Sequence, residues 1–208
     1  MKIAIDGPAA VGKTSVGRAL AEAFECRFVE TGKMYRAVAL AFDRGIPLGA
    51  IAIEVTESER FLLNGEDVTD LLHTPEYDQK SSQVATIPEV RAHLVKLQRE
   101  IAAQHDVVME GRDIGTVVLP DADVKLFLRA AAEVRAKRRM KQRHIEDYRE
   151  TLQELTRRDD RDAGREVAPL KPARDATIID TDRKTLAEVI SAVSNLVRER
   201  LGRRCQGG

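Results

Sequence analysis

Gly7-Pro8-Ala9-Ala10-Val11-Gly12-Lys13-Thr14 fits the pattern G-x-x-x-x-G-K-[ST] at every specified position. Glycines at these positions let the backbone turn its N–H groups inward around a polyphosphate, where a Cβ atom would obstruct the approach. Lys13 then reaches the outer phosphates and Thr14 offers a hydroxyl to Mg²⁺, while the helix that starts here directs its positive end at the same anion. This stretch, called the phosphate-binding loop below, predicts a nucleoside triphosphate site.

The residues on either side agree with this interpretation. Such a loop needs a buried strand before it and a helix after it. The apolar run Lys2–Asp6 precedes the loop, and Val16, Leu20 and Phe24 recur at fourfold spacing behind it. The loop alone does not decide whether the γ-phosphoryl group goes to water, to a protein or to a small molecule, because hydrolases, switches and kinases share it.

The composition indicates one compact domain without a strong charge preference. The chain has 208 residues, of which 43% are hydrophobic, and Lys plus Arg equals Asp plus Glu at 34 each. This balance gives no reason to expect nucleic acid or an anionic membrane as a partner. No apolar stretch is long enough for a membrane span and no signal segment precedes the first strand, so we expect a cytoplasmic protein. We also expect a monomer. Cys26 and Cys205 form neither a metal-spaced pair nor a disulfide framework.

Short apolar runs alternate with helical patterns along most of the chain, which predicts a doubly wound α/β fold with a parallel sheet. Helices are expected over Lys13–Phe24 and Met34–Asp43, twice within Ala132–Arg165, and from Leu186 to Leu201, followed by a frayed tail at Gly202–Gly208. The core strands are expected at Lys2–Asp6, Cys26–Glu30, Asp106–Glu110, Val124–Leu128 and Thr177–Asp180.

The region after the second predicted helix has a different sequence pattern. Ile51–Val55 and Arg60–Leu63, followed by Asn64-Gly65, predict a small antiparallel meander with a tight turn. Two helices are expected after it, because Thr74-Pro75-Glu76 and Thr86-Ile87-Pro88-Glu89 each resemble an N-cap followed by proline. This region is a candidate insertion into the α/β core.

Polar side chains follow two of the predicted core strands, at the edge where ligands bind in open α/β sheets. Arg36 lies in the segment Thr31–Arg36 and could hold a second phosphate, or it could be a surface arginine on an amphipathic helix. In the segment Glu110–Thr116, Glu110 could orient Mg²⁺ or its waters and Arg112 could bind a phosphoryl oxygen. The alternative for this second segment is a capped turn.

A charged region near residues 135–165 suggests a mobile lid. Arg158, Asp162 and Arg165 fall at i, i+4 and i+7, on one side of a helix, before a glycine- and proline-bounded stretch that could hinge. Phosphoryl transfer between two anionic substrates needs cations that offset their charge. The alternative to a lid is a solvent-exposed helical face that carries several ion pairs. Further arginines begin this region at Arg135, Arg138 and Arg139.

Taken together, these segments resemble the bacterial cytidylate kinases from end to end. The resemblance implies a P-loop fold with strand order 2-3-1-4-5 and a core of about residues 1–45, 105–131 and 170–202. It also implies a monophosphate-binding insertion over about residues 46–104 and a short helical lid over about residues 135–165. The residues that carry it are Ile5-Asp6-Gly7-Pro8, Gly32 with Tyr35-Arg36, Ser82-Gln83-Val84-Ala85 with Pro88 and Val90-Arg91, Gly111-Arg112-Asp113 with Gly115-Thr116-Val117-Val118, Arg158-Asp159-Asp160-Arg161-Asp162, and Arg165 with Val167-Ala168-Pro169-Leu170.

The resemblance also implies two nucleotide sites. ATP would contact residues 7–15, ending at Ser15, together with Arg138. For CMP, the resemblance places Ser82, Arg91 and Asp113 on the cytosine, Arg158 and Asp162 on the sugar, and Arg36, Arg112 and Arg165 on the phosphates, with Thr31 beside them. Cytosine presents an N4 amino donor beside N3 and O2 acceptors, so a carboxylate opposite N4 and donors opposite the others suit it, whereas uracil would leave that carboxylate unpaired.

The reaction that follows is transfer of the γ-phosphoryl group of MgATP to CMP or dCMP, with Lys13, Arg112 and Arg165 as the catalytic residues. Thr14 and Glu110 would hold Mg²⁺, the glutamate through water. Two positions depart from the family pattern, since Glu110 stands where aspartate is usual and Thr31 where serine is common. The competing interpretations are a kinase for UMP or another small acceptor, and a nucleotide-controlled switch or ATPase.

Overall fold

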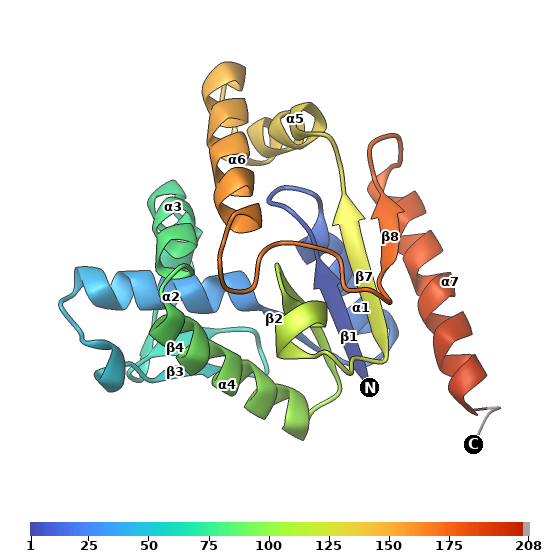
Figure 1. Ribbon diagram of the computed structural model, residues 1–208, viewed down its shortest axis with the longest axis horizontal. Helices are drawn as coiled ribbons and strands as arrows, with labels where there is room; N and C mark the ends of the chain where they lie inside the picture. Colours follow the sequence, from blue (N-terminus) through green and yellow to red (C-terminus); the bar gives the residue numbers. More distant parts are fainter. Residues whose placement is uncertain (206–208) are drawn as a thin grey trace.

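The computed structural model describes residues 1–205 and is built around a parallel sheet (Figure 1). The sheet has five strands in the order β2-β6-β1-β7-β8, which is the predicted order 2-3-1-4-5 once the strands of the insertion are set aside. All five predicted core strands are confirmed within one or two residues at each end. They are β1 (Lys2–Asp6), β2 (Arg27–Glu30), β6 (Val107–Gly111), β7 (Val124–Arg129) and β8 (Thr177–Asp180).

Helices cover both faces of this sheet, as the doubly wound fold requires. Alternate residues of β1 point to opposite faces, so Ile3 and Ile5 belong to one hydrophobic cluster and Ala4 to the other. The first cluster lies under α1 (Lys13–Ala23) and α7 (Leu186–Cys205). The second lies under α2 (Thr31–Asp43) and α4 (Pro88–Gln104). Each fully buried Ile or Leu contributes about 1.5–3 kcal/mol, so these clusters fix the sheet that carries the site.

The insertion forms a separate small sheet beside the core. Strands β3 (Ile53–Val55), β4 (Phe61–Leu63) and β5 (Glu66–Asp67) pair in antiparallel order, which confirms the predicted meander. Asn64 and Gly65 turn between β4 and β5 with φ of 50° and 85°, the left-handed geometry that an Asn-Gly pair favours. Helix α3 (Pro75–Val84) follows and leads into α4.

Two helices make up the predicted lid. Helix α5 (Ala132–Arg143) and helix α6 (Tyr148–Ala163) lie beyond the carboxyl ends of β1 and β7, and α6 lies beside α3 (Figure 1). Asp147 caps α6, because its side chain accepts a hydrogen bond from the Glu150 N–H at 2.8 Å. The lid also has an apolar contact with the core, where Ala136 and Leu155 pack against Ala9 of the phosphate-binding loop.

Several boundaries differ from the sequence predictions. Helix α2 begins at Thr31 instead of Met34, so the predicted rim segment forms its first turns. Ile87, not Thr86, caps α4. A short π-helix over Ile114–Val118 occupies part of the expected loop after β6.

Helix α7 also continues beyond its predicted end to Cys205, with Leu201 still packed on the core, because a helix tolerates Gly202 at a cost of only about 1 kcal/mol. The predicted fraying of residues 206–208 lies outside the described residues. Within residues 1–205, no helix is long and apolar enough to cross a membrane.

Candidate active site

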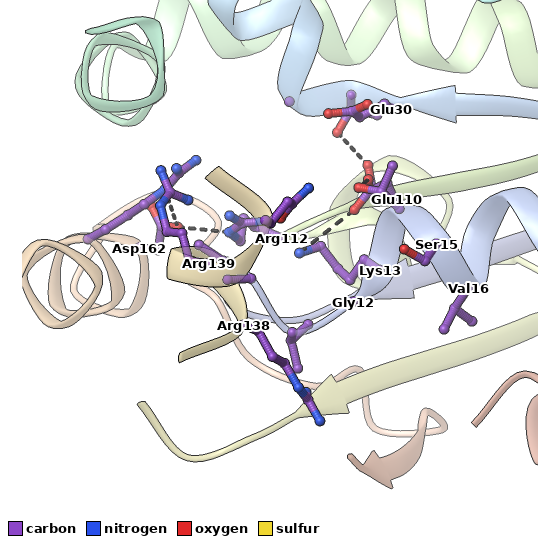
Figure 2. A pocket seen from close by; sticks show the side chains of 18 of the residues that line it. Gly12, Lys13, Ser15, Val16, Glu30, Glu110, Arg112, Arg138, Arg139 and Asp162 are labelled. Carbon is purple, nitrogen blue, oxygen red and sulfur yellow. Dashed lines mark hydrogen bonds and ion pairs between the residues drawn. The ribbon is translucent and has the colours of Figure 1, made fainter. Parts of the chain in front are cut away.

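A cavity of about 830 Å³ lies between the phosphate-binding loop, the insertion and the lid (Figure 2). It opens at the carboxyl ends of the parallel strands, where α/β proteins bind ligands. Every predicted site residue except Gly7 and Pro8 lines it. The lining residues include Ala9 to Ser15, Thr31, Arg36, Ser82, Arg91, Glu110, Arg112, Asp113, Arg138, Arg158, Asp162 and Arg165.

The two motif glycines of the phosphate-binding loop serve different physical needs. A Cβ atom on Gly7 would lie 2.3 Å from the backbone oxygen of Leu128, so the loop packs against β7 only because this residue has no side chain. Gly12 has open space around it, but its φ of 102° lies in the region that disfavours other residues. The loop therefore holds its curled conformation before any ligand binds.

Lys13 lies at the base of the cavity in a nearly water-free position. Its Nζ donates a hydrogen bond to the Pro8 carbonyl at 2.8 Å and lies 3.7 Å from a carboxylate oxygen of Glu110. Burial, and after it the positive charge of Arg112, lower the pKa of Lys13 to about 7, while Glu110 opposes the change. A polyphosphate at this position would replace the missing solvation and favour the charged form.

Thr14 and Glu110 form an oxygen pair next to Lys13. The Thr14 hydroxyl donates a hydrogen bond to one carboxylate oxygen of Glu110, and the Thr31 hydroxyl donates to the Glu110 backbone carbonyl at 2.7 Å. Among residues 1–205 there is no group of three or more His, Cys, Asp or Glu side chains able to hold a metal ion by themselves. One hydroxyl and one carboxylate suit Mg²⁺, which keeps several waters and binds through substrate phosphates.

Asp162 gathers the arginines at the lid side of the cavity, and its residue is only 1% exposed. Figure 2 shows Arg112 reaching from the end of β6 to Asp162, and their Nε and Oδ2 atoms lie 2.8 Å apart. Arg158 approaches the same oxygen at 4.0 Å, and Arg165 bonds the other. Burial by itself would raise the pKa of Asp162, but these guanidinium groups, Arg112 foremost, hold it below its usual range.

Arg91 and Asp113 form a buried ion pair at the insertion side. The Tyr35 hydroxyl lies 3.4 Å from Arg91, and burial raises the pKa of Tyr35 to about 12, so it stays protonated. Burial also raises the pKa of Asp113, against the effect of Arg91. The Asp6 carboxylate fixes the turn that carries Asp113, because it accepts the N–H groups of Ile114 and Gly115, both at 2.8 Å.

Some arginine N–H groups around this cavity have no acceptor. The Nε atoms of Arg36 and Arg165 and the Nη1 atom of Arg143 are buried, and among residues 1–205 no hydrogen-bond partner reaches them. Buried donors of this kind are rare in proteins, and guanidinium groups bind phosphate oxygens in a bidentate manner. The cavity therefore has the chemistry of a site for phosphate groups at both its loop side and its lid side.

The comparisons with known proteins agree with this geometry. The family model described as cytidylate kinase matches residues 3–199. The chain belongs to the cytidylate kinase family. It is 47% identical to the cytidylate kinase of Mycobacterium leprae, with 96% of each chain covered, and 41% identical to that of Thermotoga maritima, with 96% of this chain and 98% of the relative covered.

Solved structures that resemble this cytidylate kinase family member support the fold alone. A gluconokinase from Sinorhizobium meliloti matches with a TM-score of 0.55 at 18% identity and covers 100% of this chain and 97% of its own. A shikimate kinase from Bacteroides thetaiotaomicron matches with a TM-score of 0.51 at 14% identity, covering 95% and 98%. Both are small-molecule kinases by name, which agrees with the P-loop kinase fold.

The structure brings together residues that sequence reasoning assigned separately, with some differences in detail. Gly7 and Pro8 belong to the loop but are not among the residues that line the cavity. Arg138 points away from the Arg112–Asp162 pair (Figure 2) and donates to the Thr181 hydroxyl at 2.9 Å. Arg165 lies just past the end of α6, which stops at Ala163, yet it still meets Asp162.

One buried acidic residue of the site escaped sequence reasoning. Asp78 on α3 bonds several arginines, among them Arg139 and Arg143 on α5. The only signal in the sequence is its spacing of four residues from Ser82, which puts the two side chains on one face of a helix. Nothing local predicts that this face meets the lid.

Proposed function

We propose that this cytidylate kinase family member transfers the γ-phosphoryl group of MgATP to an α-phosphate oxygen of CMP or dCMP, giving ADP and CDP or dCDP. The observation that carries the proposal is one cavity that joins a phosphate-binding loop to the buried Arg91–Asp113 pair. The loop accounts for the triphosphate donor, and the carboxylate accounts for a base with an amino group at its edge. Family membership supports the same acceptor.

On the donor side, the loop amides of residues 7–15 cradle the β- and γ-phosphates, and Lys13 follows the γ-phosphoryl group as it moves. Thr14 and Glu110 would hold Mg²⁺, which would offset the negative charge of the phosphates there. Arg138 stands near the end of β8 with Thr181 and completes the donor side.

On the acceptor side, Asp113 accepts a hydrogen bond from the N4 amino group of cytosine, while Arg91 and Ser82 donate hydrogen bonds to its N3 and O2 atoms. Arg36, Arg112 and Arg165 bind the phosphates, with the Thr31 hydroxyl beside Arg36. Arg158 and Asp162 face the sugar. Asp162 is engaged by arginines, so sugar binding at this carboxylate requires those contacts to loosen.

The chemistry needs no general base, because the attacking phosphate oxygen is already anionic. Catalysis comes from holding the two phosphates in line, excluding water and offsetting charge in a low-dielectric site. Lys13 acts from the phosphate-binding loop, while Arg112 and Arg165 act from the lid side of the cavity. All groups come from a single chain, so we expect a monomer to be active, and sedimentation at assay concentration tests this expectation.

The deciding experiment measures ADP formation from MgATP with CMP, dCMP, UMP, AMP and no acceptor in parallel, and identifies the products. We expect CMP and dCMP to dominate, with CDP and dCDP formed in equal amount to ADP. Equal rates with UMP would remove Asp113 from base recognition but keep the kinase chemistry. ADP formation that no acceptor raises above the blank would replace the kinase with an ATPase or switch.

A further inference from the structure

Asp78 is a further buried carboxylate, bonded to arginines that line the cavity, and the reaction proposed above gives it no role. It lies on α3, and its residue is 3% exposed. Such a charge is stable in a protein interior only when it is paired. Its partners are Arg36 at 2.6 Å, Arg143 at 2.6 Å, Arg158 at 3.7 Å, and Arg139.

These partners belong to different parts of the molecule. Arg36 is on α2, Arg139 and Arg143 are on α5, and Arg158 is on α6. Asp78 itself belongs to the insertion, so its ion pairs tie the insertion to both lid helices. In the described part of the chain, the other polar contact between α3 and the lid is the hydrogen bond from Ser82 to Asp162 at 3.1 Å. The apolar contact of the lid is made with the phosphate-binding loop instead.

The charge balance explains why a carboxylate is needed there. Four guanidinium groups that converge without an anion repel one another, and in a buried site this repulsion is weakly screened. Burial alone would raise the pKa of Asp78, yet the arginines, Arg36 first, hold it well below its usual range. One carboxylate does not saturate four guanidinium groups. Nε of Arg36 and Nη1 of Arg143 remain without an acceptor among residues 1–205, so phosphate oxygens still find donors.

We propose that Asp78 is a positioning residue that holds the lid arginines Arg139, Arg143 and Arg158 over the acceptor site before any nucleotide binds. This inference rests on the proposed kinase function. Without the carboxylate, nucleotide binding has to gather the arginines and close the lid. The apparent affinity for the nucleotides is then the affinity of the closed form multiplied by the fraction of molecules whose lid is closed. Once both nucleotides are bound, their phosphates replace Asp78 as the central anion, so the transfer step itself changes little.

The test compares Asp78→Asn, which keeps the shape and removes the charge, with the native chain. Hydrogen exchange of α5 and α6 in the nucleotide-free protein should become faster, and the difference should disappear when MgADP and CMP are both present. The KM for CMP should rise about tenfold, as expected if one lid in ten is closed, while kcat changes less than twofold. Asp78→Glu should restore part of both effects because it keeps the charge.

The matched control is Asp43→Asn, which removes a carboxylate that also bonds α3, through Lys80. It should leave lid exchange and the KM for CMP unchanged. If Asp78→Asn does not fold, Arg143→Gln removes one of the lid partners of Asp78 instead. This variant should also speed up hydrogen exchange of the lid helices, by a smaller factor. Unchanged lid exchange, or a KM for CMP that stays the same or falls, overturns the proposal.

The failure of this inference can be told apart from failure of the proposed function. Exchange in the nucleotide-free protein reports on the lid whether or not CMP is a substrate. If the native chain does not phosphorylate CMP but lid exchange still depends on Asp78, the function is wrong and the positioning role stands.

Discussion

The two sides of the cavity are built in different ways. The floor is the phosphate-binding loop, residues 7–14, whose backbone is bent by Gly7 and Gly12 before any ligand arrives. The roof is made of side chains from α2, α5, α6, the turn after β6 and the segment after α6, and two carboxylates, Asp78 and Asp162, hold them. The arginines of this roof, called the arginine cluster, are Arg36, Arg112, Arg139, Arg143, Arg158 and Arg165.

The difference shows what each side contributes. The floor is a local structure, so its geometry depends little on the rest of the chain, and it serves any nucleoside triphosphate. The cluster exists only when α3, α5 and α6 come together, because Asp78 and Asp162 each collect arginines from more than one element. Binding on the floor is therefore built into the fold, whereas binding under the roof depends on the lid. The following predictions test this separation, from the largest expected effect to the smallest.

Removing the lysine of the floor should have the largest effect. We expect Lys13→Ala to lower kcat about 10³-fold, because it deletes a buried positive charge that acts on the transferring group. The loop conformation depends on glycines and packing, so circular dichroism and the melting temperature should stay close to native. Near-normal turnover in this variant would show that the floor works through its backbone alone.

Removing one arginine of the roof should have a smaller effect, because its neighbours in the cluster compensate in part. We expect Arg112→Ala to lower kcat/KM about 10²-fold, and Arg112→Lys to recover only some of this, since lysine lacks the planar fork. The control is Arg44→Ala, which removes an exposed arginine paired with Glu66. A loss as large as that of Lys13→Ala would contradict the division between a rigid floor and a shared roof.

The acceptor end should control selectivity and not overall rate. In Asp113→Asn, the carboxylate opposite N4 becomes an amide that can also donate to the O4 of uracil. We expect the ratio of kcat/KM for CMP to kcat/KM for UMP to fall roughly 5- to 150-fold, which corresponds to about 1–3 kcal/mol of discrimination. The exposed Asp121→Asn is the control. An unchanged ratio would exclude Asp113 from base recognition.

Proton uptake gives the smallest effect and tests the floor alone. The pKa of Lys13 is lowered to about 7, so this lysine is largely neutral in the free protein at pH 8. The anionic nucleotide raises the pKa, so binding of MgADP takes up close to one proton at pH 8 and close to none at pH 6, and affinity weakens as the pH rises. Calorimetry in buffers of different ionisation enthalpy measures this. Lys13→Arg, which stays charged, should show no such uptake, and equal uptake in both proteins would contradict the assignment.

Local patterns were enough for the core of this protein. The pattern of residues 7–14 predicted the floor of the site, because the conformation of this loop depends on its own residues. An apolar strand before it and an amphipathic helix after it supported the prediction. The same holds for the Asn64-Gly65 turn, which the left-handed φ angles confirm. Arg158, Asp162 and Arg165 were predicted to lie on one side from their spacing alone, and they do meet.

Long-range packing decided the rest. Nothing in the local sequence indicated that Asp78 on α3 meets Arg139 on α5, 61 residues later, because that contact depends on how the insertion and the lid pack against the core. It did not predict that Asp6 would fix the turn beside Asp113, a contact between residues 108 positions apart. The sequence alone therefore determined the phosphate-binding loop, since backbone geometry is set by neighbouring residues. Only the tertiary structure decided which carboxylates organise the arginines, since charges pair according to distance in space.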